Sequence, residues 1–167
     1  MRPKKKTRRK NGHRQELTRV LVQSISIGSK TKYFMKLALS EAEKAKERDE
    51  VPVGAIIVNP KNEVISSNGN RMRELNDPTS HAEILVIRNA CKILKTTKLF
   101  NFSLFTTLEP CAMCAMAISL VGIKNLYFAT EDKDKRFIVL HHSILSEGIN
   151  VKGLEAEIGR ASCRERV

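Results

Sequence analysis

With 167 residues, 41% of them hydrophobic, the chain is sized for one domain, and no run of 18 apolar residues predicts a membrane span. Two of its four cysteines are assigned to a metal site below, so the cysteines indicate a reducing compartment rather than a disulfide framework, and we expect the cytoplasm. The net charge of +12 is concentrated in residues 1–32, which hold 11 Lys and Arg against one acid, whereas residues 33–167 hold 19 against 17.

The N-terminal segment, residues 1–32, opens with the run Arg-Pro-Lys-Lys-Lys-Thr-Arg-Arg-Lys after its first residue. Such a run repels itself and predicts a basic, disordered extension. Three interpretations stay open. The segment is an arm that attracts RNA through its phosphates, a nuclear or organelle targeting segment, or an incidental extension upstream of a start at Met35.

Hydrophobic periodicity and turn signals predict a series of helices and strands in the rest of the chain. We expect a helix over 33–48, strands over 53–59 and 64–68, a helix over 84–94, a strand over 103–107, a helix over 111–121, a strand over 125–130 and a short strand over 149–151. The opening hairpin and the alternation of strands and helices after it predict an α/β fold. In this fold a central mixed sheet of about five strands carries helices on both faces.

Two short motifs carry the chemistry of the chain. His81 and Glu83 lie two positions apart, and Cys111 and Cys114 lie three positions apart, directly after Pro110. One imidazole and two thiolates form a three-ligand zinc set whose fourth position stays open for water, as in catalytic zinc sites. The pattern H-x-E…P-C-x-x-C is an established signature of zinc-dependent nucleobase deaminases. We therefore predict one catalytic zinc ion, held by the histidine and both cysteines.

The carboxylate of Glu83 is predicted to move protons rather than to bind metal. Zinc lowers the pKa of water from about 15.7 to about 7, so hydroxide becomes available at neutral pH. Attack of hydroxide on a base needs a second group that protonates the ring nitrogen and later the departing amine. A carboxylate beside a metal-bound water serves both transfers, so Glu83 is the candidate catalytic residue.

Both motifs are predicted at helix starts. Residues 77–80, Asp-Pro-Thr-Ser, supply capping candidates for the helix that follows His81, and Pro110 suits the start of the next helix. Cys111 and Cys114 then share one helix face, and a helix N-terminus stabilises the thiolate form that binds metal. An isolated C-x-x-C is also typical of half a zinc ribbon or of a redox pair. However, no second C-x-x-C exists, and a redox pair leaves the His-x-Glu motif unexplained.

At residues 33–130 the chain resembles the bacterial tRNA-specific adenosine deaminases of the cytidine deaminase superfamily. The segments that carry the resemblance are 50–58 (Glu-Val-Pro-Val-Gly-Ala-Ile-Ile-Val), 76–84 (Asn-Asp-Pro-Thr-Ser-His-Ala-Glu-Ile) and 107–114 (Thr-Leu-Glu-Pro-Cys-Ala-Met-Cys). The resemblance implies a cytidine-deaminase-like three-layer α/β/α fold. It also implies a homodimer in which both chains contribute to the RNA surface, and the anticodon loop of a tRNA as substrate.

The resemblance also assigns roles to single residues. The zinc ligands of the family fall on His81, Cys111 and Cys114, and its proton-shuttling glutamate falls on Glu83. An asparagine that precedes the histidine, and that holds the target nucleoside, falls on Asn70. Without the resemblance, the Asn-Gly-Asn run that ends at Asn70 predicts a turn.

The leading hypothesis for function is hydrolytic deamination of adenosine to inosine at the wobble position of tRNA, with the base splayed from its loop into the zinc pocket. A free nucleobase or nucleoside deaminase of the guanine or cytosine type shares the signature and stays open as the alternative. Asn70 and the Asp-Pro-Thr run at 77–79 favour the tRNA enzyme. A non-catalytic zinc-binding subunit is expected to lack Glu83, and a basic nucleic-acid-binding module leaves the zinc set unexplained.

Past Asp132 the resemblance weakens. A short charged and apolar stretch runs directly to His141 and His142, where the family has a glycine- and alanine-rich loop, so the loop is expected to be shortened. We interpret the two histidines as surface residues, with a place in the RNA site as the alternative. The deaminase domain is expected to span 33–158, and residues 159–167, which lack apolar periodicity, to form an atypical, unstructured end.

Overall fold

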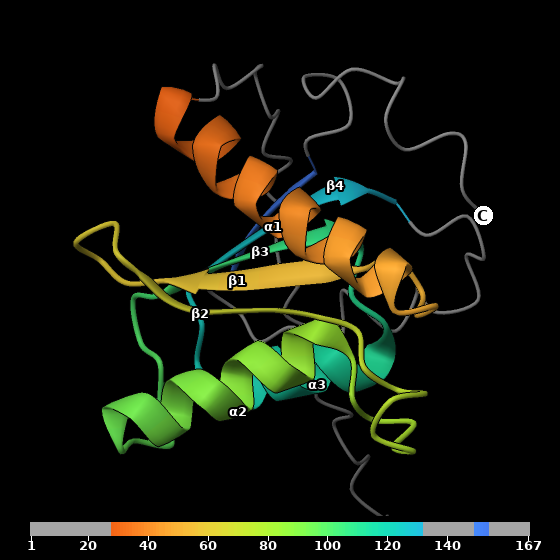
Figure 1. Cartoon of the computed structure of the whole chain (residues 1–167). Helices are drawn as coiled ribbons and strands as arrows, with labels where there is room; N and C mark the ends of the chain where they lie inside the picture. Colours follow the sequence, from red (N-terminus) through yellow and green to blue (C-terminus); the bar gives the residue numbers. More distant parts are fainter. Residues whose placement is uncertain (1–27, 132–148, 154–167) are drawn as a thin grey trace, which may run out of the picture.

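The structure, a computed structural model, describes residues 28–131 and 149–153 (Figure 1). Its helices are α1 (Ser29–Glu47), α2 (Ala82–Leu94) and α3 (Ala112–Val121). Its strands are β1 (Gly54–Val58), β2 (Val64–Gly69), β3 (Ser103–Leu108), β4 (Asn125–Thr130) and β5 (Asn150–Gly153). The basic run near the N-terminus, His141, His142 and the end at 159–167 lie outside the described residues. No helix in the described ranges combines the length and the apolar character that crossing a membrane requires.

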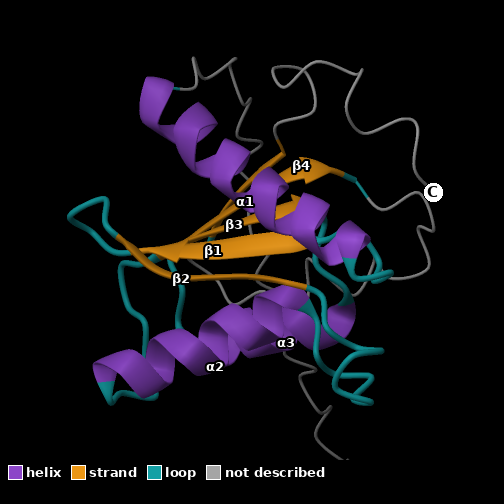
Figure 2. Ribbon diagram, in the orientation of Figure 1, coloured by secondary structure: helices purple, strands orange, loops and turns teal. Residues whose placement is uncertain are grey.

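The five described strands form one mixed sheet in the order β2-β1-β3-β4-β5. β1 pairs antiparallel with β2 and β3, whereas β3 pairs parallel with β4 and β4 parallel with β5. Helix α1 covers one face of this sheet, and α2 and α3 lie together on the other (Figures 1 and 2). The predicted three-layer α/β/α arrangement with a five-stranded mixed sheet is therefore confirmed.

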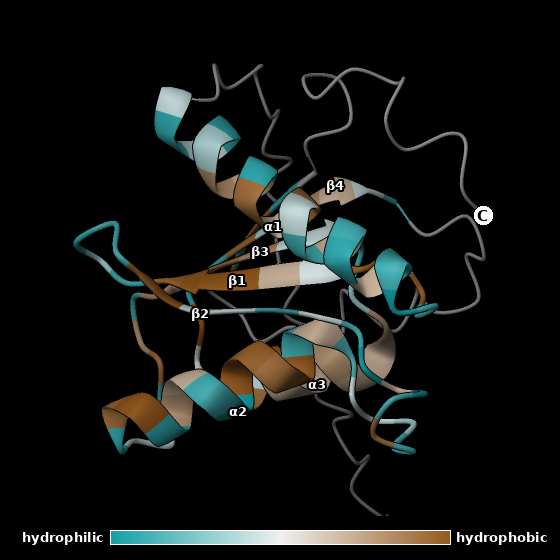
Figure 3. Ribbon diagram, viewed as in Figure 1, coloured by the Kyte–Doolittle hydropathy of each residue, from teal (hydrophilic) through white to brown (hydrophobic). Residues whose placement is uncertain are grey.

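Strand β1 lies inside the sheet and is buried along its whole length. Because side chains alternate across a strand, Ala55 and Ile57 pack toward α2 and α3, and Ile56 and Val58 pack toward α1. A strand buried on both faces needs apolar residues at every position, and β1 is accordingly brown over most of its length in Figure 3. The two apolar clusters hold the helices in place on either side of the sheet.

Helix α1 begins at Ser29, four residues before the predicted start, and its buried residues recur at helical spacing. Those residues are Phe34, Met35, Ala38, Ala42 and Ala45. The helix approaches the sheet closely over two glycines, because a Cβ at Gly54 would overlap the backbone of α1 and a Cβ at Gly69 would lie 2.8 Å from that of Ala45. Residues 38–45 of α1 therefore lie against the start of β1 and the end of β2.

Candidate active site

The two predicted half-sites both lie at helix N-termini. His81 is the residue directly before α2, and Cys111 is the residue directly before α3. Both have the extended backbone conformation that is usual for the residue before a helix. Cys114 follows on the first turn of α3 and is fully buried. Two segments that are about 30 positions apart in sequence thus meet at one point.

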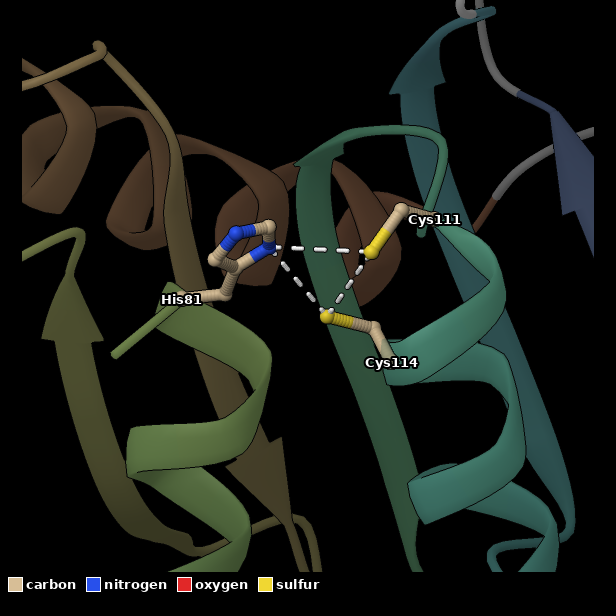
Figure 4. Close-up of side chains that lie close together, drawn as sticks. All are labelled: His81, Cys111 and Cys114. Atoms are coloured by element: carbon tan, nitrogen blue, oxygen red, sulfur yellow. Dashed lines mark hydrogen bonds between the residues drawn. The ribbon is translucent and has the colours of Figure 1, made fainter. Parts of the chain in front are cut away.

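The three candidate ligand atoms face one another, as Figure 4 shows. His81 Nδ1 lies 3.7 Å from Cys111 Sγ and 3.5 Å from Cys114 Sγ, and the two sulfur atoms are 3.7 Å apart. A tetrahedral zinc ion bound to one nitrogen and two sulfurs needs separations of about 3.6 Å between nitrogen and sulfur and about 3.8 Å between the sulfurs. The donor set therefore fits zinc in both chemistry and spacing.

Electrostatics prepare this donor set for a cation. Hydrogen bonding to the Cys114 sulfur, and to a smaller extent to the His81 ring, lowers the pKa of the Cys111 thiol to about 3. Cys111 is therefore a thiolate at neutral pH. That thiolate in turn raises the pKa of Cys114, and the contact with Cys111 raises the pKa of His81. The cluster thus holds protons that a metal ion would displace, and metal binding is expected to release them.

Glu83 lies on the first turn of α2 and is 3% exposed. Its Oε1 lies 3.4 Å from the hydroxyl of Thr106 on β3, and its Oε2 has no hydrogen-bond partner among the residues that the structure describes. Burial is the largest influence on the pKa of Glu83 and raises it. The charge of His81 lowers this pKa, and the charge of Cys111 raises it. An unpaired buried carboxylate oxygen beside residues that could hold a metal ion is a candidate for proton transfer.

Asn70 follows β2 directly and is 4% exposed. Its Oδ1 accepts a hydrogen bond from the backbone N–H of Ala82, the residue between His81 and Glu83, at 2.8 Å. Its own backbone N–H donates to Val53 O at 2.9 Å. The alternative prediction of a turn ending at Asn70 is wrong, because the two residues before it belong to β2.

The predicted capping of α2 by residues 77–80 is also wrong. The position before α2 is His81, which makes no side-chain capping bond, and Asn70 caps the helix instead. Asp77 accepts hydrogen bonds from the backbone and hydroxyl of Thr79 and from the hydroxyl of Ser80, which pull its pKa down to about 2. The Asp-Pro-Thr-Ser run therefore forms a self-bonded turn before the helix.

Three comparisons relate this chain to known proteins. Residues 28–130 match the family model of the cytidine and deoxycytidylate deaminase zinc-binding region. A tRNA-specific adenosine deaminase from Agrobacterium fabrum is 55% identical over 100 residues, 60% of this chain and 65% of the relative. One from Aquifex aeolicus is 48% identical over 115 residues, 69% of this chain and 76% of the relative. The chain thus spans slightly less than two thirds of the Agrobacterium protein.

Two solved structures of deaminases are also similar to this chain. A structure from a study of A-to-I editing by tRNA:A34 deaminases at the wobble position of transfer RNA is 46% identical. It aligns with a TM-score of 0.70 over 75% of this chain and 94% of the solved one. A guanine deaminase from Bacillus subtilis is 36% identical, with a TM-score of 0.59 over 62% of this chain and 66% of the solved one.

Proposed function

The chain belongs to the cytidine and deoxycytidylate deaminase family of zinc-binding proteins, and on that premise we propose that it converts adenosine to inosine at the wobble position of a tRNA. The similarity to tRNA-specific adenosine deaminases at 55% and 48% identity supports this substrate. The single observation that carries the chemistry is the cluster of His81, Cys111 and Cys114 with the unpaired oxygen of Glu83 buried beside it.

In this proposal His81, Cys111 and Cys114 hold the zinc ion, one per chain. When bound, zinc supplies a hydroxide nucleophile at neutral pH by lowering the pKa of water. Glu83 would take one proton from water and give it to the ring nitrogen of the base. It would then take a second proton from the hydroxyl newly bonded to the base and give it to the departing amine, which leaves as ammonia. Its buried position keeps the proton from exchanging with bulk water during these transfers.

Asn70 is proposed to hold the target nucleoside. Because its Oδ1 already accepts from Ala82, the side-chain Nδ2 is left as a hydrogen-bond donor to an acceptor atom of the base or ribose. The helix cap thereby fixes the amide orientation before substrate arrives. An orientation set in advance lowers the entropy lost on binding.

We further propose that two copies associate and that RNA binds across both. Met113, Met116 and Leu120 on α3 are 36%, 46% and 63% exposed, and their spacing places them on one helix face. An exposed apolar face of this kind is typical of an interface.

The free thiols of Cys111 and Cys114 fit a reducing compartment, and we propose the cytoplasm as the place of action.

Ammonia release tests the function directly. Purified full-length protein is incubated with a tRNA anticodon stem-loop bearing adenosine at the wobble position and, separately, with adenosine, cytidine and guanine. We expect release from the stem-loop only, and none from the Glu83→Gln variant. Release from guanine or cytidine alone would replace the proposal by a free nucleobase or nucleoside deaminase, and no release from any substrate by zinc-loaded protein would favour a non-catalytic subunit.

A further inference from the structure

A second buried acid lies outside the metal cluster. Glu50 follows the end of α1 and is 6% exposed. Its Oε1 accepts hydrogen bonds from the backbone N–H groups of Arg73 and Glu74 at 2.8 and 2.9 Å. Its own N–H donates to Ala45 O at 3.0 Å, which ties the residue to the last turn of α1. Buried carboxylates need such partners, and here both donors belong to a loop more than 20 residues away.

Neighbours of Glu50 hold the same loop, residues 70–77. The guanidinium of Arg48 donates to Asn70 O at 3.4 Å, and the guanidinium of Arg73 donates to both the backbone oxygen and the carboxylate of Asp49 at 2.6 Å. The ion pairs in this group are Arg73 with Asp49, which is largely exposed, and Arg48 with Glu74, which is about a third exposed. Pairs in contact with solvent contribute little by themselves. The carboxylate of Glu50 is the buried charged group in this set of contacts.

The loop leads from these contacts to the metal cluster. Its first residue is Asn70, whose Oδ1 accepts from Ala82 between the candidate ligand His81 and the candidate proton carrier Glu83. The next residue, Arg71, donates its backbone N–H to Ser80 O at 3.1 Å. This bond ties the start of the loop to the residue that precedes His81. Displacement of the loop therefore moves the nucleoside-holding side chain and the helix cap together.

We propose that Glu50 is a positioning residue for deamination: by holding the loop 70–77 through two backbone amides, it fixes Asn70 against the N-terminus of α2. The proposal rests on the function proposed above. Glu50 touches neither substrate nor metal and acts through Asn70. A misplacement of about 1 Å at a reacting centre costs up to about 100-fold in rate, so loss of the Glu50 contacts is expected to reduce turnover by that order.

Three substitutions in the full-length, zinc-loaded protein separate the hydrogen bonds from the charge. Glu50→Gln keeps an acceptor oxygen and is expected to retain turnover close to that of the wild type. Glu50→Asp keeps the charge but loses reach, and Glu50→Ala loses both, so turnover of each is expected to fall by up to about 100-fold with zinc content unchanged. Glu63→Ala is the matched control, since it removes an exposed carboxylate that accepts from Asn59 in the β1–β2 turn.

Two readouts distinguish positioning from a general loss of structure. Amide hydrogen exchange should accelerate at Arg73, Glu74 and Ala82 in Glu50→Asp, while the core of α2 stays protected. In a double-mutant cycle, Glu50→Asp should cost much less turnover when Asn70 has already been replaced by alanine. Fully additive losses, unchanged exchange at these amides, or an active Asp variant beside an inactive Gln variant would each overturn the proposal.

The same design keeps this inference separate from the proposed function. If the wild type deaminates none of the substrates offered, the proposed function fails, and the exchange rates at Arg73 and Glu74 still show whether Glu50 holds the loop. If the wild type is active and Glu50→Asp and Glu50→Ala turn over at the wild-type rate, the function stands and the positioning role is wrong.

Discussion

The hydroxyl of Thr106 on β3, the middle strand of the sheet, lies 3.4 Å from Oε1 of Glu83 on α2. Thr106 is fully buried, so this contact joins one carboxylate oxygen to the middle of the sheet. The other oxygen, Oε2, is left without a hydrogen-bond partner among the described residues. One end of the carboxylate is held by the sheet, and the other is available for protons.

Replacement of Glu83 by Gln should leave zinc content and folding intact while turnover falls by at least about 100-fold. The amide keeps the shape of the side chain and its contact with Thr106 but cannot carry a proton between water and base, and general acid–base catalysis typically contributes 10²–10⁴-fold. Single-turnover rates on the anticodon stem-loop offered as substrate, with metal analysis of the same sample, check this expectation. Turnover within a few-fold of the wild type would contradict the role.

Removal of one thiol from the cluster should abolish stoichiometric zinc. Cys114→Ala leaves only two of the three candidate ligands, whereas Cys91→Ala removes a partly buried thiol that packs against the core and lies outside the cluster. Metal analysis after purification in the same buffer is expected to give about one zinc per chain for Cys91→Ala and little for Cys114→Ala. Equal zinc in both variants would refute the ligand assignment.

The predicted elements were confirmed where local periodicity determines them. A few neighbouring residues are enough to recognise the apolar run of β1 and the helical spacing of Phe34 and Ala38. Each of the two motifs at the helix starts is also confined to a few residues. Helix ends were less predictable. The start of α1 at Ser29 was missed because its first turn carries no apolar residue that would extend the helical pattern.

The contacts that a sequence pattern could not reveal join distant positions. Asn70 caps α2 from 12 residues away, and Glu50 reaches Arg73 across 23. Neither leaves a local signal, because the acceptor and the donor are brought together only by the sheet and by the packing of α1. The strand order is likewise a long-range property, which turn residues and propensities do not encode.

A methyl group added at Gly54 should destabilise the protein strongly. A Cβ there would overlap the carbonyl oxygen of Ala38 and the amide nitrogen of Ala42, which are backbone atoms of α1 and cannot move aside cheaply. Overpacking of this kind typically costs about 1–3 kcal/mol. Gly28→Ala is the control, because nothing lies within 4 Å of its added Cβ. Urea unfolding of both variants measures the difference, and equal midpoints would show that α1 can retreat from the sheet.

The stability contributed by Asp77 should be lost in acid. Hydrogen bonds from Thr79 and Ser80 hold its pKa at about 2, below the ordinary value of 3.8, so the contribution is complete above about pH 4 and disappears as pH falls toward 2. Asp77→Asn, which mimics the protonated acid, should therefore melt below the wild type at pH 5–7 and converge with it near pH 2. A melting difference that stays constant over this range would contradict the assigned cause.

The exposed face of α3 should decide the oligomeric state. Light scattering at micromolar concentration is expected to give twice the chain mass for the wild type and a shift toward the monomer for Met116→Glu, because a charge desolvated at an apolar contact is costly. Val64→Glu, which alters an exposed position on β2, is the control and should leave the mass unchanged. A monomeric wild type would remove the proposal that both copies form the RNA surface.

His81 and Cys111 lie directly before two different helices and are 30 positions apart in the chain, so an ion bound between them is a ligand of the folded state alone. By mass action, free zinc at 100 times its dissociation constant adds about 2.7 kcal/mol to the free energy of unfolding. The melting temperature is consequently a function of zinc supply as well as of sequence. Two preparations of the same chain with different metal loading will differ in heat resistance, and a cell short of zinc will hold less of the folded protein.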